Sequence, residues 1–140
     1  MGVRQTVFIA GLLTIGCSGG KTAPVSGKVT LDGKPLADAT VVFQPIGSEK
    51  SVSPGPGSQG KTDENGHYSL QVVGEGTHGA YVGKHRVEIS KFVREKGEAS
   101  GDRDNRSRDI VPPKYNLKTT LTRDVPPGGT QKANFDLESR

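Results

Sequence analysis

The sequence has no tryptophan, one cysteine and one methionine, and its remaining aromatic residues are four phenylalanines and three tyrosines. A single thiol excludes an internal disulfide, so stability must come from packing rather than from covalent cross-links. The few aromatic side chains leave little material for stacking platforms that bind nucleic acid bases. A hydrophobic content of 31% and twenty glycines predict a modest core and long loops.

A strong excess of either charge is also lacking. The chain has 19 Lys and Arg residues and 15 Asp and Glu residues. Arg4 is the one basic residue before Cys17, so from residue 17 onward 18 basic residues face 15 acidic ones, a net charge of about +3. Nucleic-acid binding needs clustered basic side chains, usually with aromatic residues among them. We therefore expect no nucleic-acid partner.

A long hydrophobic run is missing, but a short one opens the chain. Arg4 makes the first residues positive, residues 6–15 are almost wholly apolar, and small residues surround Cys17. About ten apolar residues are half of the roughly twenty that a membrane-spanning helix needs. A basic start, a short apolar run and small residues at a cleavage site are typical of an export signal. We expect an exported protein that loses residues 1–16.

The residues Leu13-Thr14-Ile15-Gly16-Cys17 resemble the lipobox of bacterial lipoproteins. The resemblance implies that the Cys17 thiol receives a diacylglycerol, that Cys17 becomes the new N-terminus, and that the lipid holds the protein on a membrane. Thr14 departs from the pattern, because the family prefers leucine at this position. The alternatives are a cleaved secretory signal that leaves a free thiol, or an uncleaved apolar tail.

The expected organisation is a signal peptide at 1–16, a small polar tether at 17–24 and one domain at 25–140. Residues 17–140 number 124, enough for one domain that buries about two-thirds of its unfolded surface. Alternation of apolar and polar residues predicts short strands near 25–31, 39–44, 68–72, 83–91, 117–121 and 133–137. The expected inward residues are Val25, Gly27, Val29, Leu31, Ala39, Val41, Phe43, Tyr68, Leu70, Val72, His85, Val87, Ile89, Leu117, Thr119, Leu121, Ala133, Phe135 and Leu137.

Turns and loops separate these strands. Asp32-Gly33 and Gly66 favour tight turns, and we expect Pro35 to interrupt pairing and residues 124–130 to form a further turn. Residues 46–60, rich in Ser, Gly and Pro, and residues 94–109, with five basic and five acidic side chains, read as solvated loops. Residues 110–115 read as extended, and no segment has a helical period. The pattern predicts an all-β, antiparallel β-sandwich of six to seven strands.

Four motifs resemble carboxypeptidase-regulatory-like, transthyretin-like domains: VSGKVT at 25–30, DGKPLADATVVF at 32–43, TDENGHYSL at 62–70 and VGKHRVEIS at 82–90. PKY at 113–115 and FDL at 135–137 are similar to a set of small lipoproteins of planctomycete bacteria with such a domain. The resemblance implies a seven-strand, prealbumin-like sandwich. It specifies no function, because the shared residues shape strands and turns. His85 stands where many relatives have an aromatic residue, which implies either a partly buried histidine or a titratable group at the rim.

The sequence carries no recognisable catalytic or metal-binding motif. His67, His78 and His85 are not spaced as metal ligands, the acidic turn at 63–65 lacks the ligand pattern of an EF-hand loop, and no serine lies in a Gly-x-Ser-x-Gly elbow. Hydroxyisourate hydrolases share the transthyretin-like fold, but their closing Tyr-Arg-Gly-Ser signature is absent here. We expect no cofactor, no metal and no enzymatic activity.

The leading hypothesis is a non-catalytic, lipid-anchored β-sandwich that serves as a binding or structural module of the cell envelope. Its partners would be the membrane, through Cys17, and an envelope protein or glycan, met through loops 46–60 and 94–109 if these are not mere spacers. One alternative is a carbohydrate-binding module that uses Tyr81 and Tyr115. The other is a hydroxyisourate-hydrolase-like enzyme that uses His67, His78 and His85.

Overall fold

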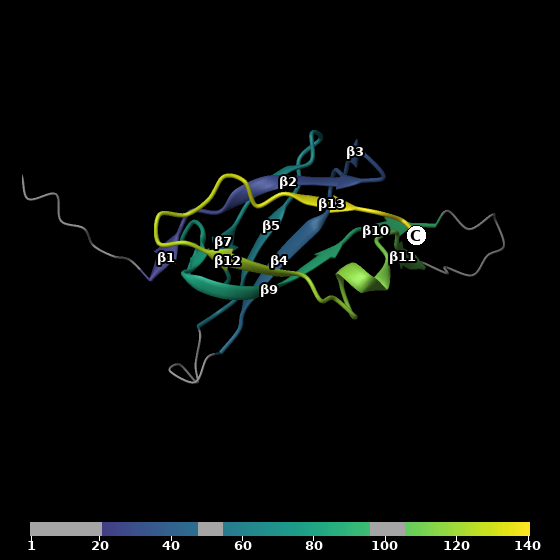
Figure 1. The fold of residues 1–140 in the computed structure, drawn as a ribbon. Helices are drawn as coiled ribbons and strands as arrows, with labels where there is room; N and C mark the ends of the chain where they lie inside the picture. Colours follow the sequence, from purple (N-terminus) through teal and green to yellow (C-terminus); the bar gives the residue numbers. More distant parts are fainter. Residues whose placement is uncertain (1–20, 48–54, 96–105) are drawn as a thin grey trace, which may run out of the picture.

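The computed structural model describes residues 21–47, 55–95 and 106–140, and these form an all-β sandwich, as the alternation predicts (Figure 1). One sheet has five strands in the order β12 (Thr122–Val125), β9 (Gly83–Ser90), β4 (Thr40–Pro45), β5 (Ser58–Lys61) and β7 (Gln71–Val72). The second sheet is built on β2 (Ser26–Leu31), which pairs with β13 (Phe135–Leu137), β3 (Lys34–Pro35) and β6 (His67–Ser69).

Two short strand pairs lie at opposite ends of the sandwich (Figure 1). At one end, β1 (Thr22–Ala23) pairs with β8 (Ala80–Tyr81). At the other, β10 (Phe92–Arg94) pairs with β11 (Ser107–Asp109), close to a single 3-10 turn, η1 (Pro113–Tyr115). Because β8 precedes the eight residues of β9 and β10 follows them, β9 sets the distance between the ends at about 25 Å.

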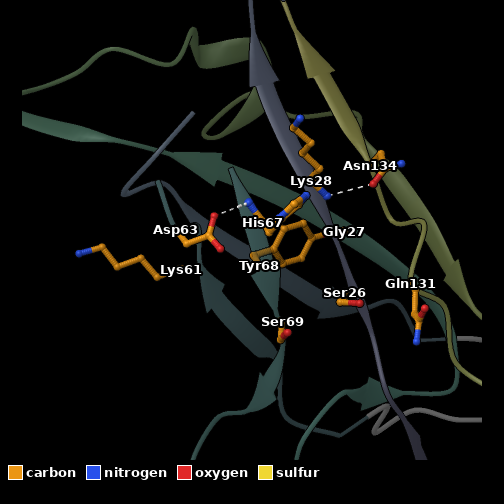
Figure 2. A pocket seen from close by; sticks show the side chains of 10 residues that line it. All are labelled: Ser26, Gly27, Lys28, Lys61, Asp63, His67, Tyr68, Ser69, Gln131 and Asn134. Atoms are coloured by element: carbon orange, nitrogen blue, oxygen red, sulfur yellow. Dashed lines mark hydrogen bonds between the residues drawn. The ribbon is translucent and has the colours of Figure 1, made fainter. Parts of the chain in front are cut away.

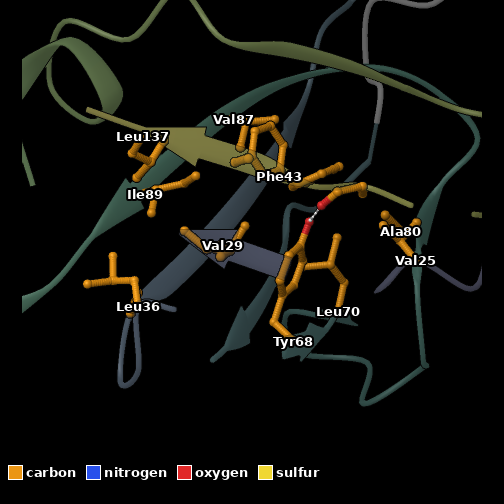
Figure 3. Packing of buried hydrophobic residues seen from close by; sticks show 14 of the residues in the cluster. Val25, Val29, Leu36, Phe43, Tyr68, Leu70, Ala80, Val87, Ile89 and Leu137 are labelled. Carbon is orange, nitrogen blue, oxygen red and sulfur yellow. Dashed lines mark hydrogen bonds between the residues drawn. The ribbon is translucent and has the colours of Figure 1, made fainter. Parts of the chain in front are cut away.

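The period of two predicted for the main strands is confirmed. Along β4, Val41 and Phe43 are buried and Val42 between them is partly exposed, and β9 buries His85, Val87 and Ile89 in the same way. Apolar and polar side chains alternate because successive residues of a strand point to opposite faces. The buried residues of both sheets pack into one core (Figure 3).

Aromatic contacts join the two sheets within this core. The ring of Phe43, from the five-stranded sheet, meets the ring of Phe135 edge to face, with 6.2 Å between centroids. Tyr68 on β6 donates its hydroxyl hydrogen to the carbonyl oxygen of Ala133 at 2.6 Å, which ties the approach to β13 onto the second sheet (Figure 3). These contacts place the last strand in the core, as its apolar alternation predicts.

The turn predictions are largely confirmed. Asp32 and Gly33 both have positive φ, 52° and 79°, as a tight hairpin turn between β2 and β3 requires. Gly66 also has positive φ, 78°, and its N–H donates to the Asp63 carbonyl. The expectation that Pro35 interrupts pairing is wrong, because Pro35 lies opposite Thr30 in the short β3 and the chain leaves the ladder only after it.

The tight turn at Gly66 does not join two paired strands, so the segment 61–72 is not a simple hairpin. β6 pairs with β2, whereas β7 pairs with β5 in the other sheet. The chain therefore changes sheets at Leu70, which is buried between them together with Tyr68 and Val72, as predicted. Each of the three side chains still points inward because the alternation continues through the crossing.

Both predicted loops are shorter than expected. Ser58, Gln59 and Gly60 belong to β5, which pairs with β4 and β7, although their composition reads as a loop. At the other loop, Arg94 closes β10, and Ser107–Asp109 forms β11 opposite it. Cross-strand pairing compensates for weak intrinsic strand propensity at both sites. Residues 48–54 and 96–105 lie outside the described residues.

The predicted strand at 117–121 is wrong. Residues 113–118 form the η1 turn and the turns after it, Leu117 is 87% exposed, and the strand is β12, so Asp124 and Val125 also leave the predicted turn. Polar side chains occupy the edge of β9 instead. The Thr119 hydroxyl donates to the Val87 carbonyl at 2.8 Å, and the Asn116 amide donates to the Ile89 carbonyl at 3.4 Å. Side-chain donors thus take the place of a strand there.

Two further details differ from the expectation. The sandwich is not purely antiparallel, because β13 runs parallel to β2, with Phe135 opposite Val29 and Leu137 opposite Leu31. The folded part also begins before residue 25. Thr22 and Ala23, assigned to the tether by their small, polar composition, form β1, and Ala23 is buried because it packs in the core.

Candidate functional site

An open trough of about 740 Å³ lies over β2 and β6 (Figure 2). The register places Ser26 opposite Ser69 and Lys28 opposite His67. Because the pair between them, Gly27 and Tyr68, is buried, these four side chains project from the outer face of the sheet. The lining residues are Ser26, Gly27, Lys28, Lys61, Asp63, His67, Tyr68, Ser69, Gln131 and Asn134.

Hydrogen bonds fix the walls of the trough. On one side, Asp63 Oδ1 accepts the backbone N–H groups of Asn65 and His67, each at 2.9 Å, so this carboxylate holds the turn before β6. On the other side, Asn134 Oδ1 accepts the Lys28 backbone N–H at 2.9 Å (Figure 2). Backbone and side chains therefore hold both walls in place without a ligand.

The trough has a cationic, hydrogen-bonding lining. Lys61 pairs with Asp38 at 3.5 Å, an exposed contact of little strength. Among the described residues, no carboxylate pairs with the Lys28 ammonium group. Ser26, Ser69 and Gln131 add hydroxyl and amide groups that can donate or accept. The arrangement suits a ligand with many polar groups along its length.

A second depression of about 400 Å³ extends this surface along β2. It shares Ser26, Ser69 and Gln131 with the trough and reaches His78 and Gly129. Because they share these residues, the two depressions adjoin each other along β2, and apolar residues and glycines line part of the second one. Such a shape can accommodate an extended chain better than a compact small molecule.

The three histidines lie in different environments. His67 lines the trough, His78 lines the second depression and bridges to Gln71, and His85 is buried in the five-stranded sheet. The cluster that the hydrolase alternative requires would need His85 at an open surface, and it is only 1% exposed. No group of three His, Cys, Asp or Glu residues within the described ranges could hold a metal ion.

His85 is part of the core. Its Nδ1 lies 3.0 Å from the Gly83 carbonyl oxygen, and its ring packs against Phe43 with 5.6 Å between centroids. Nε2 is buried with no hydrogen-bond partner among the described residues. Burial lowers the pKa of His85, although the Gly83 carbonyl and the charge of Asp124 partly oppose this effect. The histidine therefore fills the space of an aromatic residue as a neutral ring.

The two tyrosines of the carbohydrate alternative are engaged within the fold. The Tyr81 hydroxyl donates to Glu75 Oε1 at 3.0 Å, and this bond raises the Tyr81 pKa. The Tyr115 hydroxyl accepts the Glu138 N–H at 3.1 Å. Both rings are partly covered and lie outside the trough. A sugar bound in the trough would meet hydroxyl, amide and ammonium groups instead.

Residues 1–16 and the first half of the tether, residues 17–20 with Cys17, lie outside the described residues. Of the two loops expected to meet a partner, the described parts are residues 46–47 and 55–60 of the first and residues 94–95 and 106–109 of the second. Within residues 21–47, 55–95 and 106–140, no helix is long and apolar enough to cross a membrane.

Sequence reasoning missed the trough. The outward set of the predicted first strand, Ser26 and Lys28, was readable from alternation, but the pairing of β2 with β6 was not. No sequence pattern places Gln131 and Asn134 in the trough, because they precede β13, and the parallel partner of β13 is distant in the sequence.

Comparisons with known proteins add no family. No protein-family model matches the chain, and no curated protein matches it. Among solved structures, the chain is similar to part of a 9R-lipoxygenase from Cyanothece PCC8801, with 12% identity and a TM-score of 0.38. The match covers 99% of this chain but only 18% of the lipoxygenase chain. A similarity this weak carries no functional argument.

Proposed function

We propose that the protein is an exported lipoprotein whose β-sandwich is held on a membrane through Cys17 and binds an envelope partner without catalysing a reaction. The observation that carries the proposal is the position of β1. The described fold starts at Lys21, four residue steps after Cys17, and pairs with β8 from Thr22. Four extended steps span at most about 14 Å. A lipid on Cys17 would therefore keep the sandwich at the membrane surface.

The sequence supports the same proposal. The basic start, the short apolar run and the small residues around Cys17 form an export layout, and residues 13–17 resemble a lipobox. The strand motifs resemble carboxypeptidase-regulatory-like domains of small lipoproteins. Both resemblances favour an anchored module.

Fractionation of cells that express the Cys17→Ala variant tests the anchor. Wild type is expected in the membrane fraction with a lipid label, and the variant is expected to lose both, because it has no thiol to acylate. Thr14→Leu serves as the matched control, since it improves the lipobox without removing the thiol and should stay membrane-bound. A Cys17→Ala variant that keeps its label and its membrane association would refute the anchor.

The binding role is assigned to the trough and its extension along β2. The walls are held by hydrogen bonds, and Lys28 supplies a cation that no described carboxylate pairs with. The partner that fits is an extended polar chain, either a glycan or a protein segment. Recognition would come from hydrogen bonds and from the charge of Lys28, because Tyr68, the one tyrosine of the lining, is buried and offers no stacking surface.

Capture from envelope extracts tests the trough. Lys28→Glu reverses the charge at its centre and should lose the partners that wild type retains. Lys34→Glu makes the same charge change on β3, outside the trough, and should retain them. Equal recovery of these partners by wild type and Lys28→Glu would show that the trough does not bind them. It would not bear on the proposed lipid anchor.

A further inference from the structure

We infer that the end of the sandwich at which the chain joins the fold is a membrane-docking rim formed by Lys21, Ile46, Val82 and Lys84. The inference rests on the proposed anchoring at Cys17 and names the surface that the anchored protein lays against the bilayer. The partner is the lipid headgroup region and the first part of the acyl chains beneath it.

Backbone hydrogen bonds gather the four rim residues. The Val82 N–H donates to the Lys21 carbonyl at 2.8 Å, and the Ile46 N–H donates to the Lys84 carbonyl at 2.9 Å. Lys21 precedes β1, Val82 joins β8 to β9, Lys84 is the second residue of β9, and Ile46 follows β4. Their strands meet at the end of the sandwich marked by β1, away from the C-terminus (Figure 1).

The rim has the composition of an interfacial surface. Val82 is 39% exposed and Ile46 is 43% exposed, so each presents an apolar side chain to the surroundings. Lys21 and Lys84 are exposed beside them. Lysine stems can lie along apolar material while the ammonium groups remain among the phosphates. The rim can therefore contact both layers of the membrane interface.

Acidic groups limit the electrostatic part of this contact. Asp124 lies opposite Lys84 in the β12–β9 pair, and Glu75 accepts the hydrogen bond of Tyr81 next to β1. The charges of the two rim lysines are thus balanced by two carboxylates on neighbouring residues, and the rim is nearly neutral. Docking should depend on the apolar side chains and should differ little between zwitterionic and anionic lipid.

The tether, rather than exposure alone, selects this end. Leu117 and Phe92 are more exposed, 87% and 66%, but they belong to the end marked by β10 and η1. That end is about 25 Å away along β9, whereas the chain from Cys17 to Lys21 reaches at most about 14 Å. A lipid on Cys17 therefore brings the rim to the bilayer first.

The absence of tryptophan allows a direct test. The full chain, coupled through Cys17 to a maleimide lipid in phosphatidylcholine vesicles, is compared in vesicles with and without brominated acyl chains. Single tryptophans are introduced as Val82→Trp and, independently, as Ile46→Trp. Leu117→Trp is the matched control at the distal end. Circular dichroism of each variant verifies the sandwich.

We expect brominated lipid to reduce the fluorescence of Val82→Trp and Ile46→Trp and to leave that of Leu117→Trp unchanged. Equal fluorescence of both rim variants in the two kinds of vesicle would overturn the inference, as would a larger loss at Leu117→Trp. Because the maleimide supplies the anchor, these outcomes do not depend on whether cells acylate Cys17. A soluble, unlabelled wild-type protein in cells would instead count against the proposed function.

Discussion

Two buried polar atoms without partners among the described residues flank the same aromatic ring. Ser58 lies opposite Phe43 in the β4–β5 pair, and His85 packs against the Phe43 ring from β9. The unpaired atoms are Ser58 Oγ and His85 Nε2. A buried polar group without a partner destabilises a fold by about 1–3 kcal/mol. The core around Phe43 therefore contains two polar atoms that lower the stability of the fold.

His85 makes the stability of the sandwich depend on pH. Burial lowers its pKa in the folded state, so the unfolded chain, with a pKa near the ordinary value of about 6.5, binds more protons in mildly acid solution. The contribution of neutral His85 is fully present above that value. It is lost as pH falls from about 6.5 through the folded-state pKa.

We expect His85→Phe to flatten this part of the pH dependence, because phenylalanine fills the same space without a titrating group. Urea unfolding at about pH 7.5 and at about pH 5 measures the change. His67→Gln, which alters an exposed histidine, should keep the wild-type dependence. Identical slopes for wild type and His85→Phe would show that His85 is not its source.

At the scale of elements, alternation was enough to predict β2, β4, β9 and β13 and the side chains they bury. It was not enough where contacts with other strands determine the secondary structure of a segment. The Leu-x-Thr-x-Leu pattern at 117–121 imitates a strand, but Asn116 and Thr119 turn inward to satisfy carbonyls of β9. The trough was not predicted either, because its lining depends on the pairing of β2 with β6, which alternation does not reveal.

The β1–β8 pair is the element on which the proposed orientation depends, and Gly79 permits it. Gly79 has a φ of 100°, and a Cβ at this position would lie 2.0 Å from the Ala23 carbonyl oxygen. Gly76 also has positive φ, 67°, but no atom lies within 4 Å of its Cβ position. Both alanine variants carry backbone strain, and only one forces β1 away from β8.

Gly79→Ala should therefore be less stable than Gly76→Ala by about 1–3 kcal/mol, the usual cost of overpacking. It should also expose the Val82 amide, which donates to Lys21 when β1 is in place. Hydrogen exchange at Val82 provides the measurement. Equal protection of this amide in the two variants would show that β1 tolerates the added methyl group.

As a whole, the molecule is a sandwich held by one core, with the described chain entering at one end and the trough along its side. The described ion pairs are exposed and contribute little. With one cysteine, no internal disulfide supports the fold. The single thiol therefore has no second cysteine with which to form a disulfide, and attachment is the role that the sequence around it favours.

The mass of the protein extracted from membranes shows whether Cys17 is the acylated N-terminus. We expect a chain that begins at Cys17, with residues 1–16 removed and the mass of a diacylglycerol on the cysteine-containing peptide. A chain that begins at Cys17 or elsewhere with an unmodified thiol, or one that keeps Met1 without a lipid, would contradict it.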